Sequence, residues 1–302
     1  MSAFMVVASV LALSGLGTGQ DEFRARGDFW SSIHSLAQSD TPEQNRELLN
    51  YVRSLTPEEL VAAARQGCIA GENKPKLTMD WERKAAAESN ALLCLEIYFE
   101  VLSQDEERKQ DCEEMAETVM ELLADRDQLI CLRRAIVSRI SYSETTAFQL
   151  AMMRYAARHP RQVDEVLGAI IENRHEESDL REEAISAVSR GIHKQVRTIC
   201  RSDPNVREAI EVKRKHTNKL IRVSELIRAG EVTLTDETLK ALKPIAARIL
   251  ANLRLLGPIL ADAENEPPDL RKQARRTLEG YRKSALTGID DEVEKALRGA
   301  AD

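Results

Sequence analysis

Apolar residues recur every three or four positions through most of this chain, which is the spacing of one face of an α-helix. Val163, Leu167 and Ile170 form one such stripe, and the positions between stripes are mostly charged. Each segment is therefore expected to bury one side and to expose the other. The stretch with a period of two, Glu231–Thr235, is too short to imply a sheet. The pattern predicts about a dozen helices and essentially no strands.

Start and stop signals divide this pattern into separate helices. Thr41 and Thr56 are each followed by proline and glutamate, the order typical of a helix cap and first turn. We expect the helix that follows Thr56 to stop near Gly67. A long helix is expected over residues 79–103, with an apolar stripe made of Trp81, Ala85, Leu92, Leu95, Phe99 and Leu102.

The second half of the chain predicts longer helices. One is expected to begin at Pro204 and to end at Gly230, with an apolar face that includes Val206, Val212, His216, Leu220, Val223 and Ile227. Another begins at Asp236, and Pro244 and Pro258 are expected to bend or divide it. His216 is of interest because it falls in the apolar phase. We interpret it as a buried, hydrogen-bonded histidine rather than as a ligand or a proton switch.

Composition supports a helical chain. The 302 residues include 13 glycines and 9 prolines, fewer than average usage would give, and aromatic residues make up 4%. With 43% apolar and 31% charged residues, these values argue against a β-sandwich, a barrel or a disordered chain. Amphipathic helices joined by short turns pack either as a closed bundle or as a solenoid of stacked helix pairs.

A recurring local pattern favours the solenoid. A cap or breaker, an apolar residue, an arginine and a small residue follow one another in Asp179–Ala184, Asp203–Ala209 and Pro268–Ala274. This order resembles the start of the second helix in HEAT-type repeats, over about residues 127–286. The resemblance implies an irregular stack of antiparallel helix pairs, a HEAT-like α-solenoid, and a scaffold or binding surface; it supplies no catalytic residue. A helical bundle is the alternative.

The N-terminus is predicted to direct export. An apolar run over residues 4–13 leads into small residues, and Gly17 and Gly19 stand where a signal peptidase would require small side chains. No lysine or arginine precedes the run, so an uncleaved membrane anchor is the alternative. A membrane span is not favoured, because the apolar run gives way to glycines after Leu13. We therefore divide the chain into a signal peptide (residues 1–19), an acidic helical region (20–125) and a HEAT-like region (126–302), and expect a periplasmic or extracellular protein.

Charge is distributed unevenly. Residues 1–150 carry 15 basic and 25 acidic side chains, whereas residues 190–222 carry 10 basic and 3 acidic ones. This basic run predicts a site for an anionic partner, such as an acidic polymer or a lipid headgroup. Nucleic acid is disfavoured because no aromatic side chain interrupts the run to stack on bases. The candidate binding residues are Arg190, Lys194, Arg197, Arg201, Arg214, Lys215 and Lys219.

Motifs for catalysis are missing from the sequence. No nucleophile elbow, phosphate loop, metalloprotease motif or Cys-x-x-Cys pair occurs, so we expect no catalytic residue, metal site or cofactor. Of the five cysteines, Cys94, Cys112 and Cys131 are 18 and 19 residues apart, and neighbouring helices could pair two of them; Cys68 and Cys200 are the others. Buried free thiols are the favoured interpretation. The sequence predicts a non-enzymatic helical-repeat scaffold that binds a protein partner, with an enzyme built in a helical bundle or a peripheral anion binder as alternatives.

Overall fold

The computed structural model describes residues 29–38, 41–103, 108–141, 146–216, 222–282 and 290–298. Within these ranges the chain forms fourteen helices and no strand, so the prediction of an all-α fold is confirmed. The helices divide into two compact units, residues 1–166 and 167–302. The predicted boundary at residues 125–126 falls in a turn inside the first unit. The predicted signal peptide, residues 1–19, lies outside the described residues.

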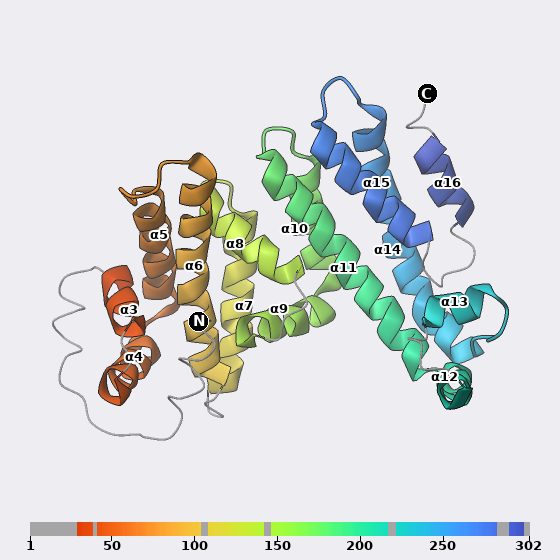
Figure 1. Ribbon diagram of the computed structural model, residues 1–302, viewed down its shortest axis with the longest axis horizontal. Helices are drawn as coiled ribbons and strands as arrows, with labels where there is room; N and C mark the ends of the chain where they lie inside the picture. Colours follow the sequence, from red (N-terminus) through yellow and green to blue (C-terminus); the bar gives the residue numbers. More distant parts are fainter. Residues whose placement is uncertain are drawn as a thin grey trace. The chain divides into compact units, whose positions relative to one another are not determined.

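The first unit contains seven complete helices among its described residues (Figure 1). They are α3 (Phe29–Ala37), α4 (Pro42–Ser54), α5 (Pro57–Glu72), α6 (Asp80–Ser103), α7 (Lys109–Ala124), α8 (Ile130–Ser141) and α9 (Ala147–Arg158). The boundary between the units then falls inside α10 (Pro160–Glu172). The predicted start signals are confirmed, since Thr56 accepts a hydrogen bond from the backbone N–H of Glu59 at 3.3 Å and Thr41 caps α4 in the same way.

The central helix of this unit is α6, because α4, α5, α7, α8 and α9 all pack against it. Its buried face includes Leu95, Phe99 and Leu102, and the ring of Phe99 lies 5.0 Å from that of Phe148 on α9. The predicted stripe is therefore right in the second half of the helix. It is wrong at the start, where Trp81 is 66% exposed because α6 extends there beyond the end of α5.

The closest helix contact joins α5 and α6. The amide of Asn90 donates to the carbonyl oxygen of Gly67 at 3.0 Å, and a Cβ atom added to Gly71 would lie 2.4 Å from the backbone nitrogen of Ala87. These glycines therefore allow the two backbones to touch. The prediction that α5 stops near Gly67 is wrong, since this glycine packs against a neighbouring helix inside α5 and the helix continues to Glu72.

The second unit contains six complete helices among its described residues, in addition to the end of α10. They are α11 (Ser178–Ser202), α12 (Pro204–His216), α13 (Val223–Arg228), α14 (Asp236–Ala261), α15 (Pro268–Arg282) and α16 (Asp290–Arg298). Helix α15 packs against α11, α14 and α16 (Figure 1). Its Leu270, Leu278 and Tyr281 are fully buried. The hydroxyl of Tyr281 accepts a hydrogen bond from the buried amide of Asn252 on α14 at 3.1 Å.

The structure tests three predictions about these helices, and the first is wrong. The helix expected over residues 204–230 is interrupted: α12 ends at His216, and α13 begins after Arg222, whose backbone is extended. The predicted stop at Gly230 is confirmed, with φ at 70°. Pro244 and Pro258 do not divide α14, which runs through both.

Helix α14 is, among the described residues, the one helix long and apolar enough to cross a membrane by length and composition. Nine of its side chains are buried inside the protein, and it packs against α11, α15 and α16. Core helices of this kind meet the same criterion, so the finding is weak evidence for a membrane span.

A repeated turn joins the helices of three hairpins. The residue that follows α7, α10 or α14 is Asp125, Asn173 or Asp262, and its side-chain oxygen accepts a backbone N–H from within the turn at 3.0–3.2 Å. Seven or eight residues later comes a leucine that is fully buried, and an arginine follows it directly. The leucines are Leu132, Leu180 and Leu270, and the arginines are Arg133, Arg181 and Arg271.

In two hairpins the arginine binds the end of the preceding helix. The Nε–H of buried Arg133 donates to the carbonyl oxygen of Leu123 at 2.9 Å, and that of Arg181 donates to Ile171 at 2.9 Å. Such carbonyls have no partner within their own helix. In the third hairpin the turn is one residue longer, and the carbonyl ten residues before the arginine, that of Ala261, accepts from Ala263. The buried Nε of Arg271 makes no hydrogen bond in the described structure.

The longer turn instead supplies a partner to Arg181. Its Nη1 and Nη2 donate to the two carboxylate oxygens of Glu266 at 2.6 and 3.0 Å, and both side chains are 3% exposed. Arg174 flanks this pair, with a nitrogen 2.8 Å from Asp262 and another 3.5 Å from Glu266. The buried pair therefore joins the start of α11 to the turn between α14 and α15.

We predict opposite effects for two glycine-to-alanine changes. Gly71→Ala should lower the free energy of unfolding by about 1–3 kcal/mol, because the new methyl group must push α5 away from α6. Gly191→Ala is the matched control inside α11, where an added Cβ meets nothing within 4 Å. It should raise stability by about 0.5–1 kcal/mol through helix propensity. Urea denaturation measures both, and a Gly71→Ala protein as stable as the unmodified chain would contradict the close contact.

The buried ion pair predicts a large loss when one partner is removed. Arg181→Met and Glu266→Gln should each cost about 3 kcal/mol or more, since the remaining polar group stays buried without its partner. Arg174→Gln is the control, because this side chain is 55% exposed and should cost less than about 1 kcal/mol. Guanidinium denaturation compares the three. Equal losses of unfolding free energy in all three variants would show that burial of the Arg181–Glu266 pair does not determine its contribution to stability.

Candidate functional site

Helix α11 gathers four of the predicted binding residues into one stripe. Arg190, Lys194, Arg197 and Arg201 follow each other at spacings of four, three and four, so they fall within about 60° of arc and extend over about 16 Å of the helix. All four are exposed. The opposite side of α11 is buried in the unit and includes Val188, Ile192 and Val196. We refer to these four basic residues as the α11 stripe.

The charge on this side of α11 changes sign along the helix. Asp179 and Glu183 lie on the same side nearer to the N-terminus, seven or more residues before Arg190. Acidic side chains near the start of a helix and basic ones near its end both interact favourably with the helix dipole. On this exposed side, the basic residues therefore lie in the second half of α11, after the acidic ones.

Helix α15 adds basic residues beside the stripe. It runs parallel to α11, because Arg181 meets Glu266 just before α15 begins, and further along His193 lies against Tyr281 with ring centroids 5.4 Å apart. Arg276 lies about one turn before Gly280, which contacts His193, and Arg190 lies about one turn before His193. Arg276 and Arg190 are therefore at about the same level along the two parallel helices. The exposed basic residues of α15 are Lys272, Arg275, Arg276 and, at its end, Arg282, which pairs with Glu294 of α16.

Sequence reasoning missed His193, which lies between the stripe and α15. Burial, and then the neighbouring guanidinium of Arg197, lower the pKa of His193 below its ordinary value. The imidazole is therefore neutral at pH 7 and adds no charge to the stripe. Its Nε2 would be 3.0 Å from a Cβ atom at Gly280, so this glycine makes room for the ring.

The other predicted residues do not join the stripe. Arg214 and Lys215 are exposed near the end of α12, ten or more residues and about 15 Å of helix beyond Pro204. Lys215 pairs with Glu211 at 3.6 Å. Lys219 lies outside the described residues. The prediction that Val212 is buried is wrong, because this side chain is 50% exposed. Like Lys219, the side chain of His216 and the whole of Leu220 lie outside the described residues.

Asp203 holds the corner between α11 and α12. One carboxylate oxygen accepts the N–H groups of Asn205 and Val206 at 2.9 and 3.3 Å, which caps α12, and the other accepts the N–H and the hydroxyl of Thr235 at 2.9 Å. The residue is 1% exposed. Burial alone would raise the pKa of Asp203, but the hydrogen bonds from Thr235, Thr238 and Val206 outweigh it and lower the pKa to about 2.

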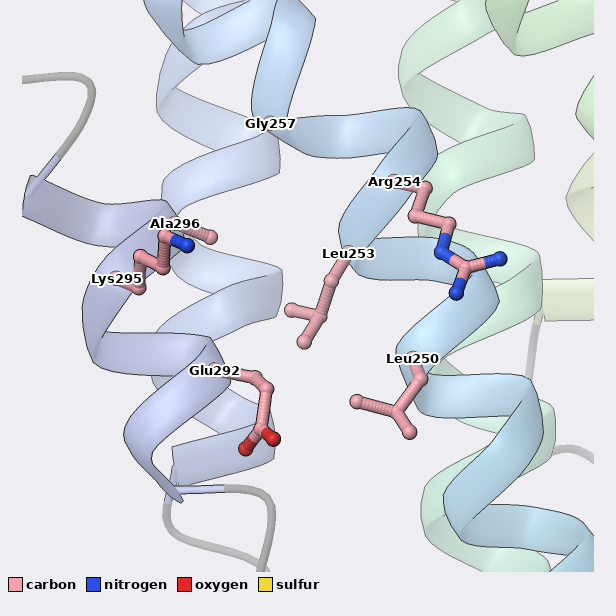
Figure 2. Close-up of a pocket in the computed structure, with 7 residues that line it drawn as sticks. All are labelled: Leu250, Leu253, Arg254, Gly257, Glu292, Lys295 and Ala296. Atoms are coloured by element: carbon pink, nitrogen blue, oxygen red, sulfur yellow. The ribbon is translucent and has the colours of Figure 1, made fainter.

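A pocket of about 570 Å³ lies between α14 and α16. Figure 2 shows Leu250 and Leu253 pointing toward α16, and Glu292 pointing back toward α14. Its described lining contains no histidine, cysteine, serine or threonine, and its charged side chains are Arg254, Glu292 and Lys295. Nor do any three His, Cys, Asp or Glu side chains in the described part of the chain form a group able to hold a metal ion.

No protein-family model, no curated protein and no solved structure matches the chain. What the α11 stripe can bind therefore follows from its own residues. It presents three guanidinium groups and one ammonium group, which donate hydrogen bonds to carboxylates, sulfates and phosphates.

Asp203 predicts a specific dependence of stability on pH. Its pKa falls on folding from the ordinary value of 3.8 to about 2, so the ionised form stabilises the folded state above pH 3.8, and this contribution is lost as the pH falls toward 2. Asp203→Asn should cost roughly 2–3 kcal/mol at pH 7, since an amide –NH₂ would face the N–H of Thr235. The deficit should shrink below pH 4.

The matched control is Asp236→Asn, which changes an exposed acid at the start of α14. Urea denaturation between pH 3 and pH 7 gives the free energy of each variant. A deficit for Asp203→Asn that stays constant across this range would contradict an ionised Asp203 at the corner.

Proposed function

We propose that the chain is a non-enzymatic helical-repeat scaffold that binds an acidic protein surface through the α11 stripe. The observation that carries the proposal is the stripe itself, four exposed basic side chains on one side of a helix whose other side is buried. Long-range attraction between such a stripe and an acidic surface speeds association and orients the partner.

The repeat architecture supports the scaffold part of this proposal. Three hairpins share the same kind of turn and the same leucine–arginine pair, and α11 and α15, each the second helix of its hairpin, lie side by side and parallel. A stack of HEAT-like pairs would place second helices in this way. The unequal turns and the helices α12 and α13 between the second and third hairpins make the array irregular.

The chemistry of the stripe favours protein carboxylates over a membrane. Helices that bind in the membrane interface insert large apolar side chains. Among the described residues, none of the exposed large apolar side chains lies on α11. Arginine, which supplies three of the four basic groups, matches the planar geometry of carboxylates with two parallel hydrogen bonds.

Two matched double variants test this function. Lys194→Ala with Arg197→Ala removes the middle of the stripe, and Arg214→Ala with Lys215→Ala removes the same two residue types from α12. All four side chains are exposed, so both proteins should melt within a few degrees of the unmodified chain. Binding to poly-L-glutamate at low salt should weaken about fivefold or more in the first variant and change little in the second.

Salt and a second probe complete the test. Binding of the unmodified chain to poly-L-glutamate should weaken steadily as salt is raised. Vesicles of phosphatidylglycerol provide the membrane arm. Equal weakening in the two variants would reject the stripe as the site, and binding to vesicles without binding to poly-L-glutamate would reject a carboxylate-bearing partner in favour of a membrane.

A further inference from the structure

Three cysteines from three different helices meet in the core of the first unit. Cys68 lies on α5, Cys94 on α6 and Cys131 on α8, and their exposed fractions are 0%, 0% and 3%. All five cysteines of the chain are free thiols in this structure. Cys112, on α7, is half-buried, and Cys200 belongs to the second unit.

The thiols of Cys68 and Cys131 lie close enough to influence each other, because a hydrogen bond with Cys131 is the largest of the effects that raise the pKa of Cys68, and Cys94 also acts on Cys68 electrostatically. A second interaction between the same two segments lies one turn earlier, where the Nε–H of Arg65 donates to the side-chain oxygen of Gln128 at 2.8 Å. Arg65 and Gln128 are each three residues before a cysteine of the pair. This second contact fixes the position along α5 at which the start of α8 packs.

The close packing of α5 also favours this meeting. The same side of the helix carries Ala64, Gly67 and Gly71, which are all buried, and at Gly71 the backbone of α6 approaches within contact distance. These small residues bring α6 close to α5, and α8 packs against both of these helices. A disulfide requires such an approach, because its Cβ atoms must come within about 3.5–4.5 Å.

We propose that Cys68 and Cys131 are a disulfide site, which closes when the chain folds in the presence of a low-molecular-weight disulfide. One protein thiolate attacks a sulfur of the oxidant and releases one small thiolate. The second protein thiolate then attacks the protein sulfur of this mixed disulfide and releases the other. The two thiol protons pass to the released thiolates, so the protein is oxidised by two electrons and the oxidant is reduced to two thiols.

Burial determines when this reaction occurs. The hydrogen bond with Cys131, and then burial, raise the pKa of Cys68, and burial raises that of Cys94. Thiolates are the reactive species, so these thiols react slowly once the core has closed. The bond is therefore made during folding or local opening, and it is then protected from reduction. It joins α5 to α8 across the same 63-residue separation as Arg65 and Gln128.

The test uses the full chain and does not depend on the proposed function. The protein is denatured, reduced and refolded in a mixture of reduced and oxidised glutathione, and a parallel sample is refolded with excess reductant. In the oxidised sample we expect two of the five thiols to be lost, the mass to fall by that of two hydrogen atoms, and peptide mapping to recover a Cys68–Cys131 cross-link. The melting temperature should rise by about 5 °C or more relative to the reduced sample.

Three variants make the result specific. Cys112→Ser should cross-link like the unmodified chain, whereas Cys68→Ala and Cys131→Ala should both retain every remaining thiol. Far-ultraviolet circular dichroism confirms that each variant has refolded. A cross-link that maps to Cys94, Cys112 or Cys200, or five thiols still titratable after oxidative refolding of a helical protein, would overturn the proposal.

Discussion

The architecture depends on how helix ends are satisfied inside the protein. The last carbonyl groups of a helix have no partner within it, and a buried helix end needs donors from elsewhere. At two hairpins here the donor is an arginine in the first turn of the next helix, Arg133 for α7 and Arg181 for α10. One side chain then fixes both the turn and the angle at which the second helix leaves it, and this positions α11 as a rigid support for its exposed side.

Arginine serves two opposite purposes on that helix. Arg181 is buried and holds a helix end and a carboxylate, whereas Arg190, nine residues later, is exposed in the α11 stripe. Nine residues turn a helix through about two and a half revolutions, so the two side chains leave it on opposite sides. The buried arginine is neutralised inside the unit by Glu266, which leaves the exposed ones to set the electrostatic character of the surface.

The sequence was a good guide wherever an interaction is local. Thr56 and Gly230 act through residues a few positions away, as does the oxygen of Asp203 that caps α12, and these roles follow from residue type and spacing. The bond from Asp203 to Thr235 is not local and was not predicted. It was a poor guide where burial depends on distant partners. Trp81 and Val212 fall in the apolar phase of their helices but are exposed, because no other element covers those positions among the described residues. The Leu132–Arg133 pair matched the recurring pattern, but Cys131 rather than an acid stands directly before the leucine, and no proline lies nearby to draw attention to it. The proximity of Cys68 to Cys131 depends on the packing of two helices far apart in sequence.

The arginine that closes a hairpin also has a kinetic consequence. Each of these hydrogen bonds joins residues ten positions apart, so the chain gives up little conformational entropy to form it, and such local contacts form early in folding. The bond between Arg181 and Glu266 spans 85 positions and must wait until the third hairpin has docked. During synthesis, the guanidinium of Arg181 therefore remains hydrated until α14 and the turn after it have left the ribosome, and α11 acquires its final position late in the assembly of its unit.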